Sequence, residues 1–298
     1  MNDGIRVSNY DGGDYPKLWV EKQRRYENEI EHIVISELLP EKGDWFADFG
    51  CAHGRLADIY VNRFKHCIML DYSIRHLEMA KKRLAGNDNI TYMAADIYKL
   101  PLRADLLDAA IMVRVIHHIE RPDIAYEGIA RILKPHSRFI TNYRNRRDLR
   151  NIIRFLLRMK NDGPFQVTHD DPSGQNTLQA FTHPKYARRL LNNAGFEIRR
   201  TRGTSFFGGK FLRIVPKPAS IEAYLYHILG MLKLSPLIFM DLEYRRASGD
   251  NAVTAESIAD ILVCPDCREK LESTMQKYRC GACGKDFPIV NGIINFHG

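Results

Sequence analysis

The sequence predicts an α/β fold, a doubly wound and mostly parallel sheet, followed by a second and much smaller domain. Strand-like and helix-like patterns alternate from about Asp44 to Asn142, which favours a parallel sheet with helices on both faces. The chain has 298 residues, enough for one large domain and a small one. Two closely spaced cysteine pairs near the C-terminus mark the small domain, because four thiols at such spacing are typical of a metal site.

The predicted strands and helices of the large domain follow one another in a regular order. The expected strands are Trp45–Phe49, Cys67–Leu70, Ile90–Ala95, Asp108–Val113 and Arg138–Asn142. The expected helices are Arg55–Arg63, Ile74–Leu84 and Ile124–Leu133. In sheets of this kind ligands bind at the carboxyl ends of the strands, so those ends are where a site is expected.

Aspartates stand at three of the first four strand ends. Asp48 lies at the first turn, Asp71 follows the second strand, and Asp96 follows the third. The first turn continues as Gly50–Gly54, with Ala52 where a dinucleotide-binding turn has its middle glycine. An aspartate in this turn would also repel a pyrophosphate. The pattern therefore favours a ligand with positive charge, ribose hydroxyls and no phosphate, which describes S-adenosylmethionine.

Four segments of this half resemble, in order, the motifs of a known enzyme family. They are ADFGCAHGRL, LDYSIRHLEMAKKRL, AADIYKLPL and LLDAAIMVRVIHHIERPDIAYEGIARILKP. Over roughly residues 40–145 the chain is similar to class I S-adenosylmethionine-dependent methyltransferases of the ubiquinone-biosynthesis-like superfamily. The resemblance implies a seven-stranded Rossmann-like sheet. Two departures from the family pattern are Ala52 in place of a glycine and His136–Ser137 in place of two glycines.

The resemblance also implies which residues bind the co-substrate. The turn backbone would hold the methionine end, with Asp48 holding the amino group directly or through the turn. Asp71 would accept both ribose hydroxyls, Asp96 would contact the adenine amino group, and Val113 would lie under the sulfonium. The full set implied is Asp48, Gly50, Cys51, Gly54, Asp71, Tyr72, Asp96, Ile97 and Val113.

Catalysis of methyl transfer needs mainly alignment, because a methyl sulfonium is already activated. His117 and His118, just after the fourth strand, are candidates for a general base, and the alternative is that they only shape the pocket. Arg114 is a candidate contact for an anionic acceptor. In the N-terminal segment Tyr10, Tyr15 and Trp19 are candidate lid aromatics, although the segment could equally cover a sheet face.

Positive charge is concentrated in one region. Residues 131–217 contain 19 Lys and Arg against 5 Asp and Glu. Within a cap insertion expected at about 144–182, a helix has an apolar stripe and three arginines, Arg150, Arg154 and Arg158, at every fourth position. This face could simply be solvated, or it could bind RNA phosphates, an anionic lipid surface or a small acidic metabolite.

The segment at about 218–246 is apolar but broken by charges and Pro236, so we expect an extra helical region rather than a membrane span. It favours a small-molecule or lipid-like acceptor. The alternatives are methylation of tRNA or rRNA through the basic cap, and a non-catalytic binding module. The sequence has no run of about 20 apolar residues and no signal peptide, so a cytoplasmic protein without transmembrane segments is expected, peripheral membrane contact remaining open.

The C-terminal stretch LVCPDCREKLESTMQKYRCGACGKDFPIVNGIINF contains two Cys-x-x-Cys pairs separated by twelve residues. We expect Cys264, Cys267, Cys280 and Cys283 to bind structural zinc tetrahedrally, a redox pair or an iron site being the alternatives. The stretch resembles small zinc-ribbon proteins that activate methyltransferases acting on tRNA, rRNA and translation factors. The predicted domains are residues 1–247 for the methyltransferase domain, 248–259 for a linker and 260–298 for the zinc ribbon.

Overall fold

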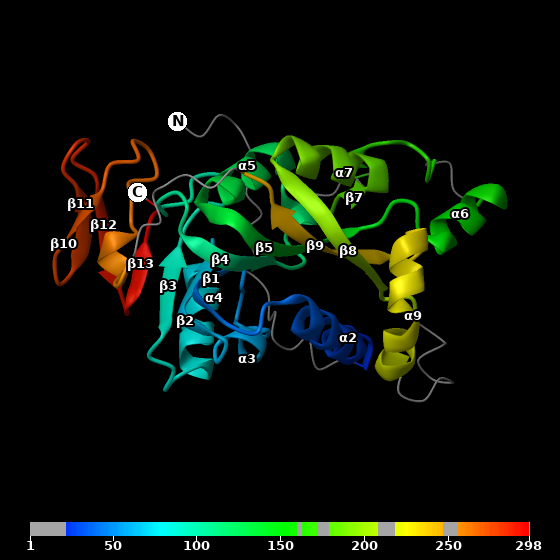
Figure 1. The fold of residues 1–298 in the computed structure, drawn as a ribbon, viewed down its shortest axis with the longest axis horizontal. Coiled ribbons are helices and arrows are strands. Elements are labelled where there is room, and N and C mark those ends of the chain that lie inside the picture. Colours follow the sequence, from blue (N-terminus) through cyan, green and yellow to red (C-terminus); the bar gives the residue numbers. More distant parts are fainter. Residues whose placement is uncertain (1–21, 160–162, 172–178, 208–217, 247–254, 298) are drawn as a thin grey trace.

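A computed structural model describes residues 22–159, 163–171, 179–207, 218–246 and 255–297 (Figure 1). The expected lid aromatics Tyr10, Tyr15 and Trp19 lie outside these residues. One long sheet runs through the molecule, with strand order β10-β11-β12-β13-β3-β2-β1-β4-β5-β9-β8. Its larger part contains β1 (Gly43–Phe49), β2 (Phe64–Asp71), β3 (Ile90–Ala94), β4 (Leu107–Met112), β5 (Leu133–Arg144), β8 (Phe196–Thr204) and β9 (Leu237–Tyr244).

The strands from β3 to β5 are parallel, whereas β9 runs antiparallel to both of its neighbours, β5 and β8. Trp45–Phe49 in β1 is buried without alternation. A central parallel strand is buried on both sides because helices cover both faces of the sheet. The sequence therefore predicted the parallel direction of the first five strands correctly.

Helices cover the two faces of the sheet. They are α2 (Lys22–Leu38), α3 (Ala57–Tyr60), α4 (Ile74–Arg83), α5 (Pro122–Ile132), α7 (Pro184–Asn193) and α9 (Pro218–Leu232). Side chains of α5 and α7 join the core on one face, and those of α2, α3, α4 and α9 pack on the other. Helix α3 is much shorter than the predicted Arg55–Arg63 because its flanks form turns.

The cap region between β5 and α7 contains α6 (Leu149–Leu156), β6 (His169–Asp170) and β7 (Phe181–Thr182). Asp148 begins α6 as its N-cap, where its carboxylate accepts hydrogen bonds from the backbone of Arg150 and Asn151. The two short strands pair antiparallel. The predicted helix is therefore present at the expected place.

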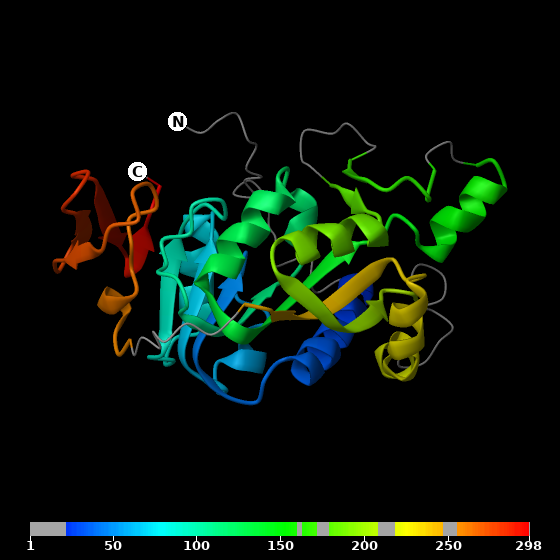
Figure 2. The ribbon, with the colours of Figure 1, turned by 45° about the horizontal axis from the view of Figure 1, so that its top comes forward.

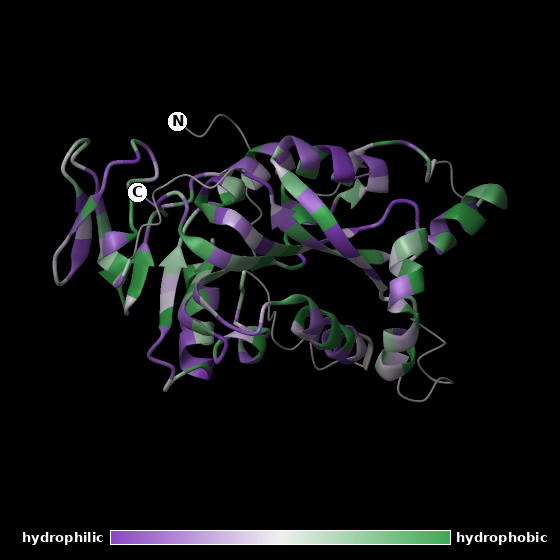
Figure 3. Ribbon diagram, in the orientation of Figure 1, coloured by the Kyte–Doolittle hydropathy of each residue, from purple (hydrophilic) through white to green (hydrophobic). Residues whose placement is uncertain are grey.

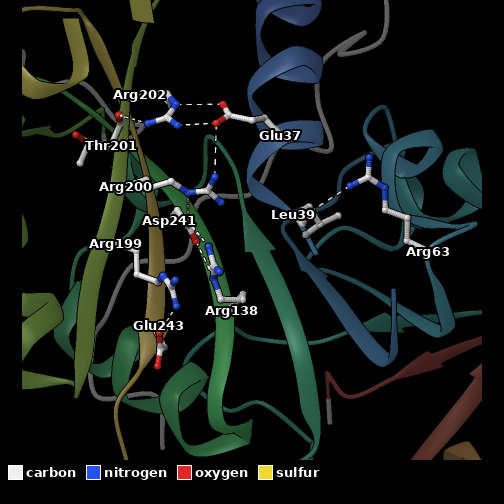
Figure 4. Close-up of polar contacts among 10 residues, drawn as sticks. All are labelled: Glu37, Leu39, Arg63, Arg138, Arg199, Arg200, Thr201, Arg202, Asp241 and Glu243. Carbon is white, nitrogen blue, oxygen red and sulfur yellow. Dashed lines mark hydrogen bonds and ion pairs between the residues drawn. The ribbon is translucent and has the colours of Figure 1, made fainter. Parts of the chain in front are cut away.

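The segment predicted as an extra helical region is only half helical. Residues 218–232 form α9, but residues 237–244 form β9, which is buried along its whole length between β5 and β8. Charge pairing permits the acids of β9 in the sheet. Asp241 binds Arg138 and Arg200, and Glu243 binds Arg199 (Figure 4). The prediction of a helix over this half was wrong because the carboxylates of β9 are paired with arginines of β5 and β8, which allows β9 to be a buried strand.

The C-terminal cysteine-containing segment forms η2 (Ile258–Asp260), β10 (Leu271–Ser273), β11 (Lys277–Cys280), β12 (Asp286–Val290) and β13 (Ile293–Asn295). Strand β13 pairs parallel with β3, the edge strand of the larger sheet. In the described residues, the seven strands of the larger part and the four of this segment therefore form one eleven-stranded sheet. In Figure 2 this segment lies at the opposite end of the molecule from α6 and α9. No helix among the described residues is long and apolar enough to cross a bilayer.

Candidate functional site

The turn after β1 requires glycine at two positions. Gly50 and Gly54 have φ angles of 73° and 71°. A Cβ on Gly50 would also lie only 2.3 Å from Cγ2 of Val115. The Gly50 amide donates a 2.7 Å hydrogen bond to the carbonyl of Leu70, which holds the turn against the end of β2. Ala52 has a φ of 46°, so alanine occupies a conformation that favours glycine.

Asp71 is held rigidly at the carboxyl end of β2. Its carboxylate accepts hydrogen bonds from the Ala52 amide at 2.8 Å and the Ser73 amide at 2.9 Å. The glycine turn and Asp71 are therefore one hydrogen-bonded unit. Asp96, after β3, accepts from the amide of Tyr98 at 2.9 Å. Asp71, Tyr72, Asp96 and Ile97 are all half-buried.

Asp48 lies beneath the turn. It is 3% exposed, and Tyr60 donates a 3.0 Å hydrogen bond to its carboxylate. Burial raises the pKa of Asp48 to about 7, although the Tyr60 hydroxyl opposes the shift. Cys51 is also buried, and burial raises its pKa well above the usual range, so its thiol is not reactive. Both side chains are placed to support the turn backbone.

The loop after β4 contains Val113, which is buried, and Arg114, whose φ is 60°. The Arg114 amide donates to the side-chain oxygen of Asn142 at 2.8 Å. Its guanidinium binds Glu31 of α2 at 2.5 Å and Glu27 at 3.0 Å. Burial alone would raise the pKa of Glu31, but the adjacent guanidinium groups lower it. Arg114 is thus engaged by carboxylates of the chain itself, which weakens its candidacy as an acceptor contact.

The two candidate histidines lie in η1 (Ile116–His118), directly after this loop. Their ring centroids are 4.0 Å apart. His117 is 6% exposed, and its Nδ1 has no hydrogen-bond partner in the described structure. Burial, reinforced by His118 and Arg144, lowers the pKa of His117 well below its usual value. His117 is therefore neutral at pH 7, and His118 is the more accessible of the pair.

Sequence reasoning missed two polar residues near this loop. Arg144, at the end of β5, donates to the Gln179 side-chain oxygen at 2.7 Å and lies 4.3 Å from the ring centre of Phe181. Asn142, two residues earlier on the strand, is fully buried, and within the described residues its Nδ2 has no partner. Their place at the carboxyl end of the fifth strand was the available signal.

The arginines of α6 lie apart from this loop. Arg154 and Arg158 are exposed. The guanidinium of Arg150 donates to the backbone carbonyls of Ser205 and Phe206. The predicted stripe therefore includes one arginine that fixes the cap to the sheet end and two that face solvent.

Four thiols meet in the C-terminal segment. The sulfur atoms of Cys264, Cys267, Cys280 and Cys283 all lie within 4.8 Å of one another. Cys264 and Cys283 are 3.6 Å apart, and Cys267 and Cys280 are 3.4 Å apart. Tetrahedral zinc with Zn–S bonds of about 2.3 Å separates its sulfurs by roughly 3.8 Å. The cluster is compatible with zinc.

This segment contacts both strand ends that carry the aspartates. The Phe296 amide donates to the carbonyl of Ala94 at 2.8 Å, and the Val263 amide to that of Pro101 at 3.0 Å. The Lys99 ammonium binds Asp266, next to Cys267, at 2.8 Å. On the other side, the His297 ring donates to the carbonyl of Tyr72 at 2.8 Å. The loop containing Asp96 and the residue after Asp71 are thus both held by the C-terminal segment.

Residues 47–141 match the family model described as a methyltransferase domain. Over these residues the chain is therefore similar to methyltransferase domains. Solved structures share its fold. They include a magnesium protoporphyrin IX methyltransferase from Synechocystis with bound S-adenosylhomocysteine, which has a TM-score of 0.53 and 16% identity and covers 78% of this chain and 93% of that chain. A complex of the Haloferax volcanii Trm112 methyltransferase activator with a methyltransferase has a TM-score of 0.53 and 15% identity, and covers 78% of this chain and 97% of that chain.

Curated methyltransferases are similar over part of the chain. A demethylmenaquinone methyltransferase of Clavibacter sepedonicus is 27% identical over 103 residues, covering 35% of this chain and 42% of that protein. The sterol 24-C-methyltransferase ERG6 of Saccharomyces cerevisiae is 22% identical and covers 56% and 43%. A ubiquinone biosynthesis O-methyltransferase of Xylella fastidiosa is 23% identical and covers 60% and 71%. The chain spans about half the length of the first relatives it matches, 42% and 54%.

Proposed function

We propose that this protein transfers a methyl group from S-adenosylmethionine to a small, lipid-like acceptor. The observation that carries the proposal is the placement of the glycine turn, Asp71 and Asp96 at the carboxyl ends of three neighbouring strands, β1, β2 and β3. The residues fit the co-substrate. The half-buried carboxylates of Asp71 and Asp96 suit hydroxyl and amino donors. Because Gly50 and Gly54 have no side chains, the backbone of the turn is accessible to the methionine end.

The proposed roles follow this arrangement. Asp71 accepts the ribose hydroxyls, Asp96 and Ile97 bind the adenine, and Val113 lies beneath the sulfonium. Asp48 acts through the turn, because its carboxylate is buried against Tyr60. The remaining contacts are assigned to Gly50, Cys51, Gly54 and Tyr72.

The bound co-substrate supplies an activated methyl group, so the protein has chiefly to align the acceptor. His117, His118, Asn142 and Arg144 form the polar part of the proposed acceptor site. His118 is the better candidate for proton acceptance, because its buried neighbour has a strongly lowered pKa and is a weak base. We assign His117 to shaping the site.

A small, lipid-like acceptor is favoured over RNA by two observations. The three curated relatives described above are named for a demethylmenaquinone, for ubiquinone biosynthesis and for a sterol. In addition, Arg150 of the proposed RNA-binding stripe is occupied by backbone carbonyls. The small-molecule proposal therefore ranks above RNA methylation.

We assign the C-terminal segment to a structural zinc ribbon that rigidifies the adenosine side of the co-substrate site in cis. Four cysteine ligands would leave no open position for catalysis. The contacts to Ala94, Pro101 and Tyr72 support this role, since they flank Asp96 and Asp71. A cytoplasmic location is part of the same proposal.

The first test is binding of S-adenosylhomocysteine by calorimetry. Asp71→Ala is expected to weaken binding roughly ten- to hundredfold, the cost of losing charged hydrogen bonds. Asp88→Ala, which removes an exposed acid elsewhere, is the matched control. No saturable binding to the wild-type protein would refute the proposal.

The second test distinguishes catalysis from silent binding, since a cyclase, SpnF, shares this fold with a TM-score of 0.52. The protein is incubated with methyl-labelled S-adenosylmethionine and an extract of its own cells. Label in the organic-soluble fraction is expected. Nuclease-sensitive label would favour RNA, and binding without any labelled product would favour a non-catalytic module.

A further inference from the structure

The outer face of α9 is apolar and exposed to solvent. Its side chains recur with helical spacing and are between 37% and 85% exposed: Ile221, Tyr224, Leu225, Ile228, Met231 and Leu232. The opposite face of the helix, including Tyr226 and Gly230, is buried against α2 and β8. The exposed stripe is therefore not part of the core, and a continuous apolar surface of this kind marks an interaction site.

Helix α6 extends this surface. It has no buried residue, and Ile153, Leu156 and Leu157 are 46%, 69% and 64% exposed. The Leu149 amide at its start donates to the carbonyl of Leu234, so the start of α6 meets the segment just after the end of α9. Figure 3 shows apolar residues on both helices at this end of the molecule. The apolar surface is thus built by two adjoining elements.

A basic cavity borders the apolar surface. Its volume is about 440 Å³, and five cations line it: Arg147, Lys185, Arg188, Arg189 and Lys233. None of the five has an acidic partner within the described part of the chain. Burial, followed by repulsion from Arg188 and Arg147, lowers the pKa of Lys233. Met231 lines an adjoining cavity together with Arg188 and Lys233, so the stripe and the cations are continuous.

We propose that α6, the outer face of α9 and this basic cavity form a docking surface for an anionic lipid bilayer. Amphipathic helices of this kind lie in the bilayer interface with the apolar face buried, and basic residues beside them bind anionic headgroups. Arg154 of α6 and Arg158, two residues after the helix ends, add exposed charge next to exposed leucines. Both components of the surface are therefore suited to the same partner.

Two other occupants fit the surface less well. A symmetric dimer through α9 would bring each basic cavity close to the one on the second copy, where like charges repel. Single-stranded RNA is bound by stacking on aromatic residues, whereas this stripe is mainly aliphatic. The charge pattern and the apolar composition together favour lipid.

The surface adjoins the catalytic end of the sheet. Asn145, the residue after β5, donates its side-chain amide to the carbonyl of Lys233 at 2.8 Å. Docking would thus hold the proposed acceptor site close to the bilayer. The inference does not rest on the identity of the acceptor. The residues of the docking surface are separate from those assigned to co-substrate binding.

The test is co-sedimentation of the full-length, zinc-loaded protein with vesicles. Phosphatidylcholine vesicles containing phosphatidylglycerol are compared with pure phosphatidylcholine. Binding is expected only to the anionic vesicles and is expected to fall as salt is raised from about 0.1 M to about 0.5 M. Arg188→Ala/Arg189→Ala should weaken binding roughly thirtyfold, from about 1 kcal/mol per basic residue near the surface.

Two further variants complete the design. Ile228→Ser/Met231→Ser removes apolar contact without changing charge and should weaken binding roughly tenfold. Lys42→Ala/Lys82→Ala removes two exposed lysines elsewhere and should leave binding unchanged. S-adenosylhomocysteine affinity and thermal melting verify that every variant is folded.

Three results would overturn the inference. The first is equal binding to neutral and anionic vesicles, or binding indifferent to both surface variants. The second is dimerisation in sedimentation velocity that Ile228→Ser/Met231→Ser abolishes, without vesicle binding. The third is tighter, salt-sensitive binding to an RNA oligonucleotide than to any vesicle.

Discussion

The two ends of the sheet are completed in opposite ways. At one end the edge strand β3 is covered by β13, and the ion pair Lys99–Asp266 joins the C-terminal segment to the loop after Asp96. At the other end, β8 and β9 are held by arginine–carboxylate pairs (Figure 4), but the neighbouring cations of α7 and Lys233 have no acids within the described chain.

The difference shows that the charge of a region does not determine its role. Residues 131–217 are strongly basic, yet Arg138, Arg200 and Arg202 are neutralised by acids from outside that region, among them Glu37 and Asp241. Only the cations without such partners are available for an external anion. The C-terminal segment is therefore paired with the rest of the protein, whereas α6 and α9 expose their outer faces to solvent.

Metal removal should have the largest effect, and it should be confined to the ribbon end. Chelation, or Cys280→Ser, would remove the proposed zinc, whose binding would be worth on the order of 10 kcal/mol to a segment too small to fold on its own core. We expect faster amide hydrogen exchange in β3 and a roughly tenfold loss of S-adenosylhomocysteine affinity, the size of an ordinary coupling between linked sites. Cys67→Ser, a buried thiol outside the ribbon, should retain metal. Unchanged cofactor affinity in the metal-free protein would separate the ribbon from the site.

Removing the buried acid of the opposite end should have the next largest effect. Asp241 is fully buried and accepts hydrogen bonds from Arg138 at 2.9 Å and Arg200 at 2.7 Å. Asp241→Ala removes the acid that Arg138 binds and leaves Arg200 only its longer 3.5 Å pair with Glu37, so it should lower the free energy of unfolding by about 3–5 kcal/mol. Urea unfolding measures it. Glu197→Ala breaks an exposed pair with Arg245 and should change stability little. Equal losses in both variants would contradict the importance of burial.

Asp48, in the middle of the sheet, is a buried acid that makes no ion pair with any described residue, and it should make stability depend on pH. Its pKa is raised to about 7, so the folded state holds a proton that the unfolded state has released above about pH 4. Stability from this group is therefore present at low pH and lost as pH rises toward 7. Between pH 5 and pH 8 the loss should be about 3 kcal/mol.

Asp48→Asn isolates this contribution. The variant should show a smaller fall in stability over the same range, measured by urea unfolding at each pH. Glu222, another buried acid whose pKa burial raises to about 7, remains in both proteins and contributes equally. An identical pH dependence in wild type and variant would mean that Asp48 is ionised in the folded state.

The cations of the basic cavity, which have no acidic partner among the described residues, should respond to substitution in the opposite direction from Asp241. Arg188→Ala/Arg189→Ala removes mutual repulsion and breaks no ion pair within the described chain, so stability should stay the same or rise by up to about 1 kcal/mol. Thermal melting at low and high salt measures this. A loss of more than about 1 kcal/mol would show that these arginines support the fold.

The first five strands and the glycine turn could be predicted because their signals are local. Asp71 and Asp96 stand directly after apolar runs, and strand order then brings them together. Strand β9 could not be predicted in the same way. Its acids, Asp241 and Glu243, argue against a buried strand until Arg138, Arg199 and Arg200 are brought beside them by pairing between distant segments.

The same limit applies to the site and the ribbon. Four cysteines indicate a metal cluster from spacing alone, but nothing in the sequence shows that Ile293–Asn295 pairs with β3. Arg114 looked available in the sequence because Glu27 and Glu31 lie more than eighty residues away along the chain. The residue-level roles in co-substrate binding stay predictions.

Substitution of Ala52 should have the smallest effect on stability. It tests whether an alanine at a position where the family pattern has glycine strains the backbone. Its φ of 46° is left-handed, where an alanine is strained and a glycine is not. Ala52→Gly relieves that strain but adds freedom to the unfolded chain, so we expect a net stabilisation of about 0.5 kcal/mol or less. Ala85→Gly, at an exposed turn position without positive φ, carries only the entropic cost and should be slightly destabilising.

Because the Ala52 amide also binds Asp71, S-adenosylhomocysteine affinity should stay unchanged if the turn keeps its shape. Destabilisation equal to that of Ala85→Gly would show that Ala52 carries no strain, and that its departure from glycine costs the fold nothing.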